Sequence, residues 1–103
     1  MTVKELVEKL RLTVYNMANE CNAEGVWCGD LLSHVMVNAP EKCAWITVMT
    51  NVNVAAVAKL RKVSCVILCC GVTPDDELLE KAKSEGVTLL GTVEDACTVA
   101  KMI

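Results

Sequence analysis

The chain has 103 residues, enough for one hydrophobic core but too few to divide into two domains, so we expect a single domain over 1–103. Hydrophobic residues make up 53% of the chain, which argues against disorder, and without Phe the core must be built mainly from Val, Leu, Ala, Met and Cys. The net charge of -3 and the scatter of the ten basic residues argue against a nucleic-acid-binding module.

Neither a secretory signal nor a membrane helix is visible in the sequence. The first ten residues are charged and amphipathic, and the apolar runs are shorter than the ~20 residues that a spanning helix needs. We therefore expect a cytoplasmic protein without a membrane partner. The seven cysteines are odd in number and include no Cys-x-x-Cys pair, which argues against a disulfide framework and fits a strongly reducing cytosol.

Helical and strand-like patterns alternate along the chain. In chain order, we expect a helix after Thr2, strands over 11–17 and 26–28 separated by a polar loop over 18–25, a helix from Asp30 to about Asn38, a strand over 44–48, a helix over 54–60, a strand over 64–70, a helix over 73–85, a strand over 87–90 and a closing helix from Thr92 or Val93. The run 64–70 is apolar without alternation, as in a central parallel strand. We therefore predict an α/β fold of two or three layers with a mostly parallel, right-handed βαβ sheet.

Several expected helices begin with a residue suited to cap the first turn. Thr2 followed by Glu5 has the spacing of a capping box. Asp30 precedes apolar residues at helical spacing, and we expect its carboxylate to cap that helix. Thr73 is expected to cap the helix in which Pro74 takes the first position.

Polar residues gather in the loops that follow the predicted parallel strands, where ligands of open α/β sheets bind. Asn51 and Asn53 would lie beside free backbone N–H groups, which favour an anionic part such as a phosphate. Asn is also a preferred N-cap, and that structural role is the simpler interpretation. The candidate ligand-binding residues are Asp30, Ser33, Thr47, Thr50, Asn51, Asn53, Gly71, Thr73 and Thr92.

Cysteines near the end of the predicted central strand are a second candidate. A thiol close to a helix N-terminus, as at Cys69 or Cys70, can become reactive, but the acidic first turn of the following helix opposes a thiolate. On a strand, Cys65 and Cys69 point to one face and Cys70 to the other, which is poor geometry for a metal site with three ligands. We assign no metal ligand and no cofactor.

The single histidine, His34, is the only imidazole base available. Its neighbour Ser33 lies about 100° around the helix, so the two side chains do not face each other. Asp30 lies four positions before His34, a pair that more often supports a helix than performs catalysis. Because no phosphate-binding loop or nucleophile elbow accompanies these residues, we expect no enzyme.

Apolar residues around the second helix suggest self-association. Trp27, Met36 and Val37 are expected to leave an apolar patch that a small domain cannot cover. A symmetric dimer is the commonest way to bury such a patch, so we expect a homodimer. The alternative, in which Trp27 closes the core, fits the sequence equally well.

Three runs in the same order resemble the DRTGG domain family: GDLLSHVM at 29–36, WITVMTNVNVAAVA at 45–58 and GVTPDDELLEKAKSEGVTLLGT at 71–92. The resemblance covers residues 2–103 and implies a fold related to the N-terminal domain of HPr kinase, without that kinase's phosphate-binding domain. This sequence departs from the family before Asp30, where it lacks the Asp-Arg pair and the Thr-Gly-Gly cluster. Asn51 also stands where related chains often have His, so a ligand of the family can be lost or altered here.

The resemblance implies a non-catalytic regulatory or interaction domain. In regulated pyrophosphatases, DRTGG domains accompany CBS domains and resemble dimer-forming parts of a nucleotide-sensing region. We therefore expect a homodimer that binds a small anionic, adenine-nucleotide-like ligand or a protein partner. Stand-alone relatives occur in anaerobes, some near iron-hydrogenase genes. The alternative is accordingly a redox- or metal-linked accessory protein of an anaerobic metalloenzyme, acting through Cys69, Cys70 and Cys28.

Overall fold

The computed structural model describes residues 1–18 and 21–103, so residues 19–20 of the predicted loop lie outside the described residues. Its elements are α1 (Val3–Leu10), β1 (Thr13–Asn16), β2 (Val26–Cys28), α2 (Leu32–Asn38), β3 (Ala44–Thr47), α3 (Asn53–Arg61), β4 (Cys65–Leu68), α4 (Asp76–Glu85), β5 (Leu89–Gly91) and α5 (Ala96–Met102). The sheet has five strands in the order β1-β5-β4-β3-β2. Strands β2 to β5 pair in parallel, and β1 pairs antiparallel with β5. The predicted α/β fold with a mostly parallel sheet is confirmed.

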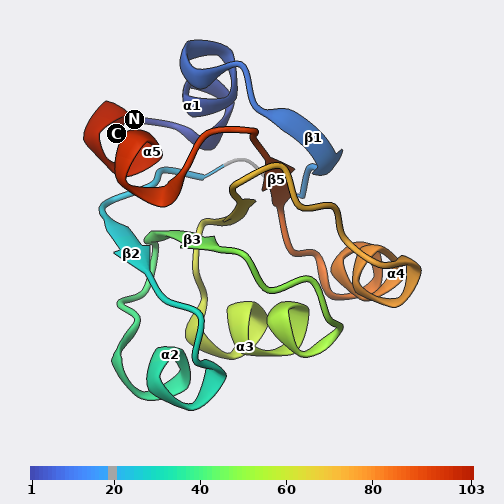
Figure 1. Ribbon diagram of the computed structural model, residues 1–103. Helices are drawn as coiled ribbons and strands as arrows, with labels where there is room; N and C mark the ends of the chain where they lie inside the picture. The colour runs from blue at the N-terminus through green and yellow to red at the C-terminus, as the bar shows by residue number, and fades with distance from the viewer. Residues whose placement is uncertain (19–20) are drawn as a thin grey trace.

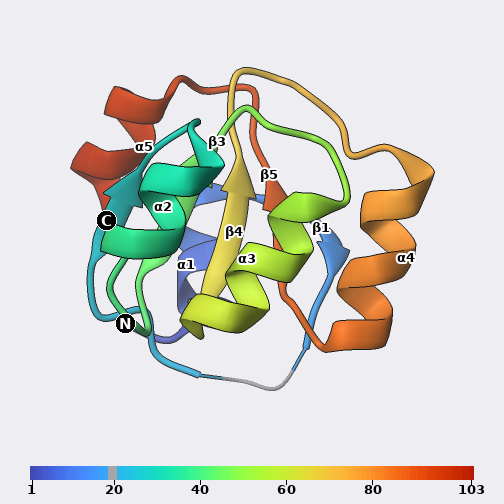
Figure 2. The same cartoon turned by 90° about the horizontal axis from the view of Figure 1, so that it is seen from below.

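The molecule has three layers, with helices on both faces of the sheet (Figures 1 and 2). Consecutive parallel strands are neighbours, and the helices that connect them, α2, α3 and α4, lie on the same face of the sheet. One buried cluster joins these helices to the sheet through Val35, Val54 and Leu78. A second cluster joins α1 and α5 to the other face through Leu6 and Val99. In the described part of the chain, no helix has the length and apolar character needed to cross a membrane.

The two central strands are buried on both faces. Every residue of β3 and β4 is buried, as the apolar run at 64–70 predicts, although β4 is shorter than that run. Trp45 of β3 is fully buried, and its indole Nε1 donates to the carbonyl oxygen of Gly29 at 3.0 Å. That bond satisfies a buried polar group and ties the end of β2 to the centre of the sheet.

The helix starts agree with prediction only in part. The Thr2 capping box of α1 is present. The predicted cap of α4 at Thr73 is wrong, because the carboxylate of Asp75 takes that role and accepts the backbone N–H of Leu78 at 2.8 Å. Helix α5 begins at Ala96 after the cap Asp95, later than predicted. In both helices Asp, a stronger N-cap than Thr, decides where the helix begins.

Helix α2 also begins later than predicted. Its N-cap position is Leu31, which offers no side-chain cap, and the helix begins at Leu32. The predicted capping role of Asp30 is therefore wrong. The carboxylate instead accepts hydrogen bonds from the end of β3, where it bonds two partners at once.

Candidate functional site

The carboxyl ends of the parallel strands β2 to β5 meet along one edge of the sheet. We call the connections that follow these strands, residues 29–31, 48–52, 69–75 and 92–95, the carboxyl edge. The amide N–H of Asp75 lies 3.4 Å from the carbonyl oxygen of Thr50, and Gly71 N–H donates to Thr92 O at 2.9 Å. Candidate residues predicted from separate loops are thus brought together along this edge.

Asp30 links β2 to β3 at the carboxyl edge. One carboxylate oxygen, Oδ1, accepts the Thr47 hydroxyl at 2.7 Å and the Val48 N–H at 2.9 Å. The Thr47 oxygen in turn accepts the Met49 N–H at 3.2 Å. Because Thr47 is only 1% exposed and its hydroxyl is already bonded, it is the candidate least accessible to a ligand. Asp30 itself remains exposed.

The start of α3 carries three further candidates. Val52 occupies the N-cap position without a side-chain cap. The Asn51 side-chain oxygen, Oδ1, accepts the Asn53 N–H at 3.0 Å, and the next two N–H groups of the first turn donate to backbone carbonyl oxygens. The prediction of free N–H groups beside these amides is therefore wrong for the first three residues of α3. Asn51 and Asn53 are exposed, and Thr50 is half-buried. The amides therefore lie where a ligand can reach them, although the oxygen of Asn51 already has a structural role.

Gly71 and Thr92 are joined through their backbones, and Thr92 N–H also donates to Leu68 O at 2.9 Å. Gly71 has a φ of +73°, which a residue with a Cβ adopts only with strain. Thr73 is exposed in the same connection, and Ser33 is exposed on α2. Both side chains are accessible to a ligand approaching this side of the molecule.

The carboxyl edge and the helix turns that follow it are acidic. They carry Asp30, Asp75, Asp76, Glu77, Glu94 and Asp95, whereas segments 29–31, 48–53, 69–77 and 92–95 contain no Lys or Arg. Hydrogen bonds from the backbone and side chain of Thr98 hold the pKa of Asp95 below its usual value. Carboxylates thus already occupy the starts of α4 and α5 and oppose an anion there. Helix α2 begins without a side-chain cap, whereas the Asn51 side chain bonds the first N–H group of α3.

A hollow of about 310 Å³ lies between the start of α3 and α4, next to Asn51 and Asn53. Its lining residues are Val52, Glu77, Glu80, Lys81 and Ser84. The Lys81 amino group lies 3.1 Å from a carboxylate oxygen of Glu85, so this cation is already paired. The hollow therefore presents mainly negative charge to a ligand.

Two cysteine sulfurs come together where β4 ends. Sγ of Cys69 and Sγ of Cys70 are 3.8 Å apart. The strand ends at Leu68 and Cys70 has a φ of 58°, so strand alternation does not extend to Cys70. The predicted placement of the two thiols on opposite faces is therefore wrong. Burial raises the pKa of Cys69 to about 12, which argues against an unassisted thiolate at neutral pH.

Two further thiols belong to the same region. Burial raises the pKa of the Cys28 thiol, and the nearby Cys97 and Asp30 raise it further. Across residues 1–18 and 21–103, no group of three or more His, Cys, Asp or Glu side chains has an arrangement that fits a metal ion.

His34 packs on an aromatic ring. Its imidazole stacks on Trp27 with ring centroids 5.8 Å apart and an interplanar angle of 24°. Its Nδ1 lies 3.3 Å from the side-chain nitrogen of Asn38. Asp30, the partner considered for His34, instead bonds Thr47. Sequence spacing did not reveal the stack, which depends on how tightly α2 folds back over β2.

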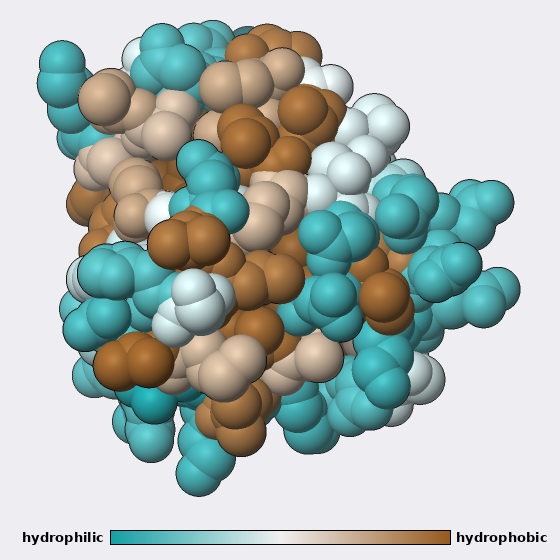
Figure 3. Space-filling model, turned by 60° about the horizontal axis from the view of Figure 1, so that its bottom comes forward, coloured by the Kyte–Doolittle hydropathy of each residue, from teal (hydrophilic) through white to brown (hydrophobic). Residues whose placement is uncertain are grey.

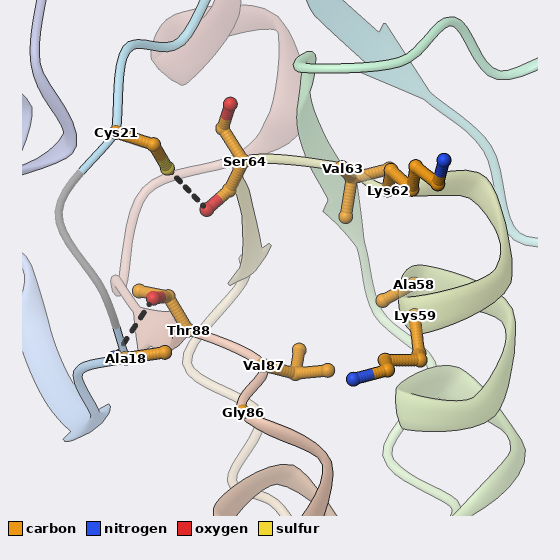
Figure 4. A pocket seen from close by; sticks show the side chains of 10 residues that line it. All are labelled: Ala18, Cys21, Ala58, Lys59, Lys62, Val63, Ser64, Gly86, Val87 and Thr88. Atoms are coloured by element: carbon orange, nitrogen blue, oxygen red, sulfur yellow. Dashed lines mark hydrogen bonds between the residues drawn. The ribbon is translucent and has the colours of Figure 1, made fainter.

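A cavity of about 380 Å³ lies at the opposite edge of the sheet, where the parallel strands begin (Figure 4). It is lined by Ala18, Cys21, Ala58, Lys59, Lys62, Val63, Ser64, Gly86, Val87 and Thr88, none of which was a candidate. Lys59 extends from α3 toward Val87, and its amino group donates to Glu85 O at 3.0 Å. The cluster of basic residues around 59–62 was the only sequence signal for this feature, and it resembled an ordinary basic helix end.

Known proteins resemble this chain in its fold and in its sequence. No curated protein matches the chain. Among solved structures, it is similar to the crystal structure of the CBS and DRTGG domains of the regulatory region of Clostridium perfringens pyrophosphatase, complexed with the activator diadenosine tetraphosphate. The sequence identity is 21% and the TM-score 0.75, and the match covers 97% of this chain but only 44% of that chain. This likeness shows a shared fold. The sequence also matches the DRTGG domain over residues 5–103, nearly its whole length, and the chain therefore belongs to the DRTGG domain family.

Proposed function

We propose that this chain is a non-catalytic regulatory domain, a homodimer that binds an adenine-nucleotide-like ligand at the carboxyl edge. The observation that carries the proposal is the gathering of exposed candidate residues from separate loops along the carboxyl edge, next to the start of α3. The pyrophosphatase regulatory region that contains a domain of this fold is complexed with diadenosine tetraphosphate, which makes adenine nucleotides the first ligands to test. The two side chains considered for catalysis, Asp30 and His34, have separate partners, because Asp30 bonds Thr47 and His34 stacks on Trp27.

The charge of the carboxyl edge restricts the form of the ligand. A bare polyphosphate would approach Asp30, Asp75 and Glu77, which repel it. A divalent cation would neutralise both partners, so the proposed ligand is a nucleotide in its Mg²⁺ complex. The exposed amide of Asn51 would donate to the ligand, and the positive end of the α3 helix dipole would favour its anionic part.

Isothermal titration calorimetry with diadenosine tetraphosphate, ATP and AMP, each with and without Mg²⁺, tests the proposal. Asn51→Asp is the informative variant, because Asp caps a helix as well as Asn does but lacks the amide donor. Losing one such bond costs about 1–3 kcal/mol, so we expect Kd to rise about 5- to 150-fold with little change in Tm. Lys62→Gln at the opposite cavity is the matched control and should bind as the wild type does.

Two outcomes would contradict the ligand proposal. If none of these nucleotides binds under any condition, the chain has no such site. If Lys62→Gln weakens binding while Asn51→Asp does not, the ligand occupies the cavity at the opposite edge.

The dimer rests on apolar side chains that α2 exposes. Val37 is 73% exposed and Met36 43%, and Leu31 just before the helix is 66% exposed. Trp27 is half-buried and packs against the core, so it contributes less to the predicted patch than its size suggested. Figure 3, in which the face with α2 and α3 comes forward, shows hydrophobic surface running across the molecule between hydrophilic groups. We expect a second copy of the chain to cover this face.

Light scattering after size exclusion tests the dimer. Val37→Glu should give monomers at concentrations where the wild type is a dimer, because it places charge in an apolar interface. Val93→Glu is the matched control, since Val93 is 82% exposed but lies in the connection between β5 and α5. A wild-type monomer, or a Val37→Glu dimer, would refute this part of the proposal and leave ligand binding untouched.

A further inference from the structure

The adjacent thiols at the end of β4 are held in place by their backbone. Cys69 N–H donates to Thr47 O at 3.0 Å, and Cys70 N–H donates to Glu94 O at 2.7 Å. Cys70 adopts the left-handed conformation, with a φ of 58°, which turns its side chain beside that of Cys69. The connections on both sides thus hold the two sulfurs at a separation of 3.8 Å.

This arrangement suits a bridging metal ion better than a disulfide. The Cα atoms of adjacent residues are about 3.8 Å apart, whereas disulfides usually join Cα atoms separated by about 4.4–6.8 Å. Metal–thiolate bonds are about 2.3 Å long, so two of them in line span about 4.6 Å. Rotation of the exposed Cys70 side chain needs to move its sulfur by less than about 1 Å to reach that span, while Cys69 stays buried.

The number of ligands selects the kind of ion. Structural Zn²⁺ takes four ligands, and the described residues offer no group of three or more His, Cys, Asp or Glu that fits a metal. Soft thiolate ligands favour Cu(I), an ion that two thiolates satisfy. The exposed sulfur of Cys70 gives an ion access from solvent, and the buried sulfur of Cys69 completes the chelate.

We propose that Cys69 and Cys70 form a two-thiolate site for Cu(I). Two S–H bonds break and two Cu–S bonds form, both protons pass to solvent, and copper remains Cu(I), so no oxidant or reductant is required. The site does not depend on the proposed nucleotide binding or on the dimer.

Anaerobic titration with Cu(I) in the presence of a chromophoric Cu(I) chelator tests the site, with native mass spectrometry to count bound copper. We expect the tightest site to hold one Cu(I) per chain. Cys70→Ser, which changes an exposed side chain, should weaken that site at least 100-fold. Cys28→Ser and Cys97→Ser are matched controls, because both thiols are exposed and belong to the same region, and they should bind as the wild type does.

Cys69→Ala is a second test and should also lose the tightest Cu(I) site, with circular dichroism to confirm folding because this residue is buried. A Cys70→Ser variant that binds Cu(I) like the wild type would overturn the proposal. Loss of the tightest site in Cys28→Ser or Cys97→Ser would also overturn it, since the ion would then be held by the other pair of thiols.

Discussion

Replacement of Asp30 by Ala should destabilise the protein by loosening the junction between β2 and β3. The carboxylate accepts two hydrogen bonds, from the Thr47 hydroxyl at 2.7 Å and the Val48 N–H at 2.9 Å. Without the carboxylate, the hydroxyl of Thr47, which is only 1% exposed, loses its hydrogen-bond acceptor. A bond to a charged group is worth about 1.5–3 kcal/mol when well shielded. Asp30 is exposed, so we expect solvent to reduce the total for both bonds to about 1–3 kcal/mol.

Urea unfolding of Asp30→Ala, Thr47→Val and the double variant measures this coupling. The interaction energy from the cycle should be about 0.5–2 kcal/mol, because the two side chains are in contact. Asp30→Asn is the control, since its amide oxygen still accepts both bonds, and it should lose less than half as much as Asp30→Ala. Each kcal/mol lost from the free energy of unfolding lowers Tm by about 4–8 °C for a domain of this size.

Two results would refute this reasoning. A coupling energy below about 0.3 kcal/mol would mean that Asp30 and Thr47 act independently. Equal losses in Asp30→Ala and Asp30→Asn would show that the charge, not the two acceptor bonds, stabilises the junction.

Three other changes test the packing and the helix caps. Asp75→Ala should lower the free energy of unfolding in urea by about 1 kcal/mol and Thr73→Ala far less, because Asp75 caps α4. Equal losses would contradict that assignment. Burial raises the pKa of Cys65 from 9.0 to about 12, so stability should be intact below pH 9 and fall as pH rises from 9 toward 12. The decline in Tm between pH 8 and pH 11 should be smaller in Cys65→Ala, and identical declines would count against the buried thiol as its source. Gly91→Ala places a Cβ 2.6 Å from the Tyr15 ring and should lower the free energy of unfolding by about 1–3 kcal/mol in the wild type. The same change should cost much less in a Tyr15→Ala background, and equal costs in the two backgrounds would contradict a local clash.

The sheet was predictable because its signals are local and strong. The buried runs of β3 and β4 contain too few polar residues for an edge strand. One helix with short loops joins these strands, which leaves few alternatives to parallel neighbours. Helix starts were less predictable. In the connection to α4, Thr73 and Asp75 are both suitable caps, and only the folded geometry shows which side chain reaches a free N–H group.

The carboxyl edge was predictable as a place but not as a set of contacts. Strand order alone brings Thr50, Gly71 and Thr92 to one edge. The bond from Thr47 to Asp30 joins residues that are 17 positions apart, so no local pattern announces it. The sulfur contact of Cys69 and Cys70 was missed for the opposite reason, since the alternation of side chains along a strand was applied to the two residues beyond the end of β4.

Charge separates the two ends of the sheet and bears directly on the proposed ligand. Asp30, Asp75 and Asp95 make the carboxyl edge negative, whereas Lys59 and Lys62 line the cavity at the other end. If a nucleotide binds at the carboxyl edge, Mg²⁺ must strengthen binding, because the ion offsets the repulsion between phosphates and carboxylates. If a nucleotide binds at the cavity, Mg²⁺ must weaken binding or leave it unchanged, because the lysines already supply positive charge. The sign of the Mg²⁺ effect therefore distinguishes the two sites without any substitution.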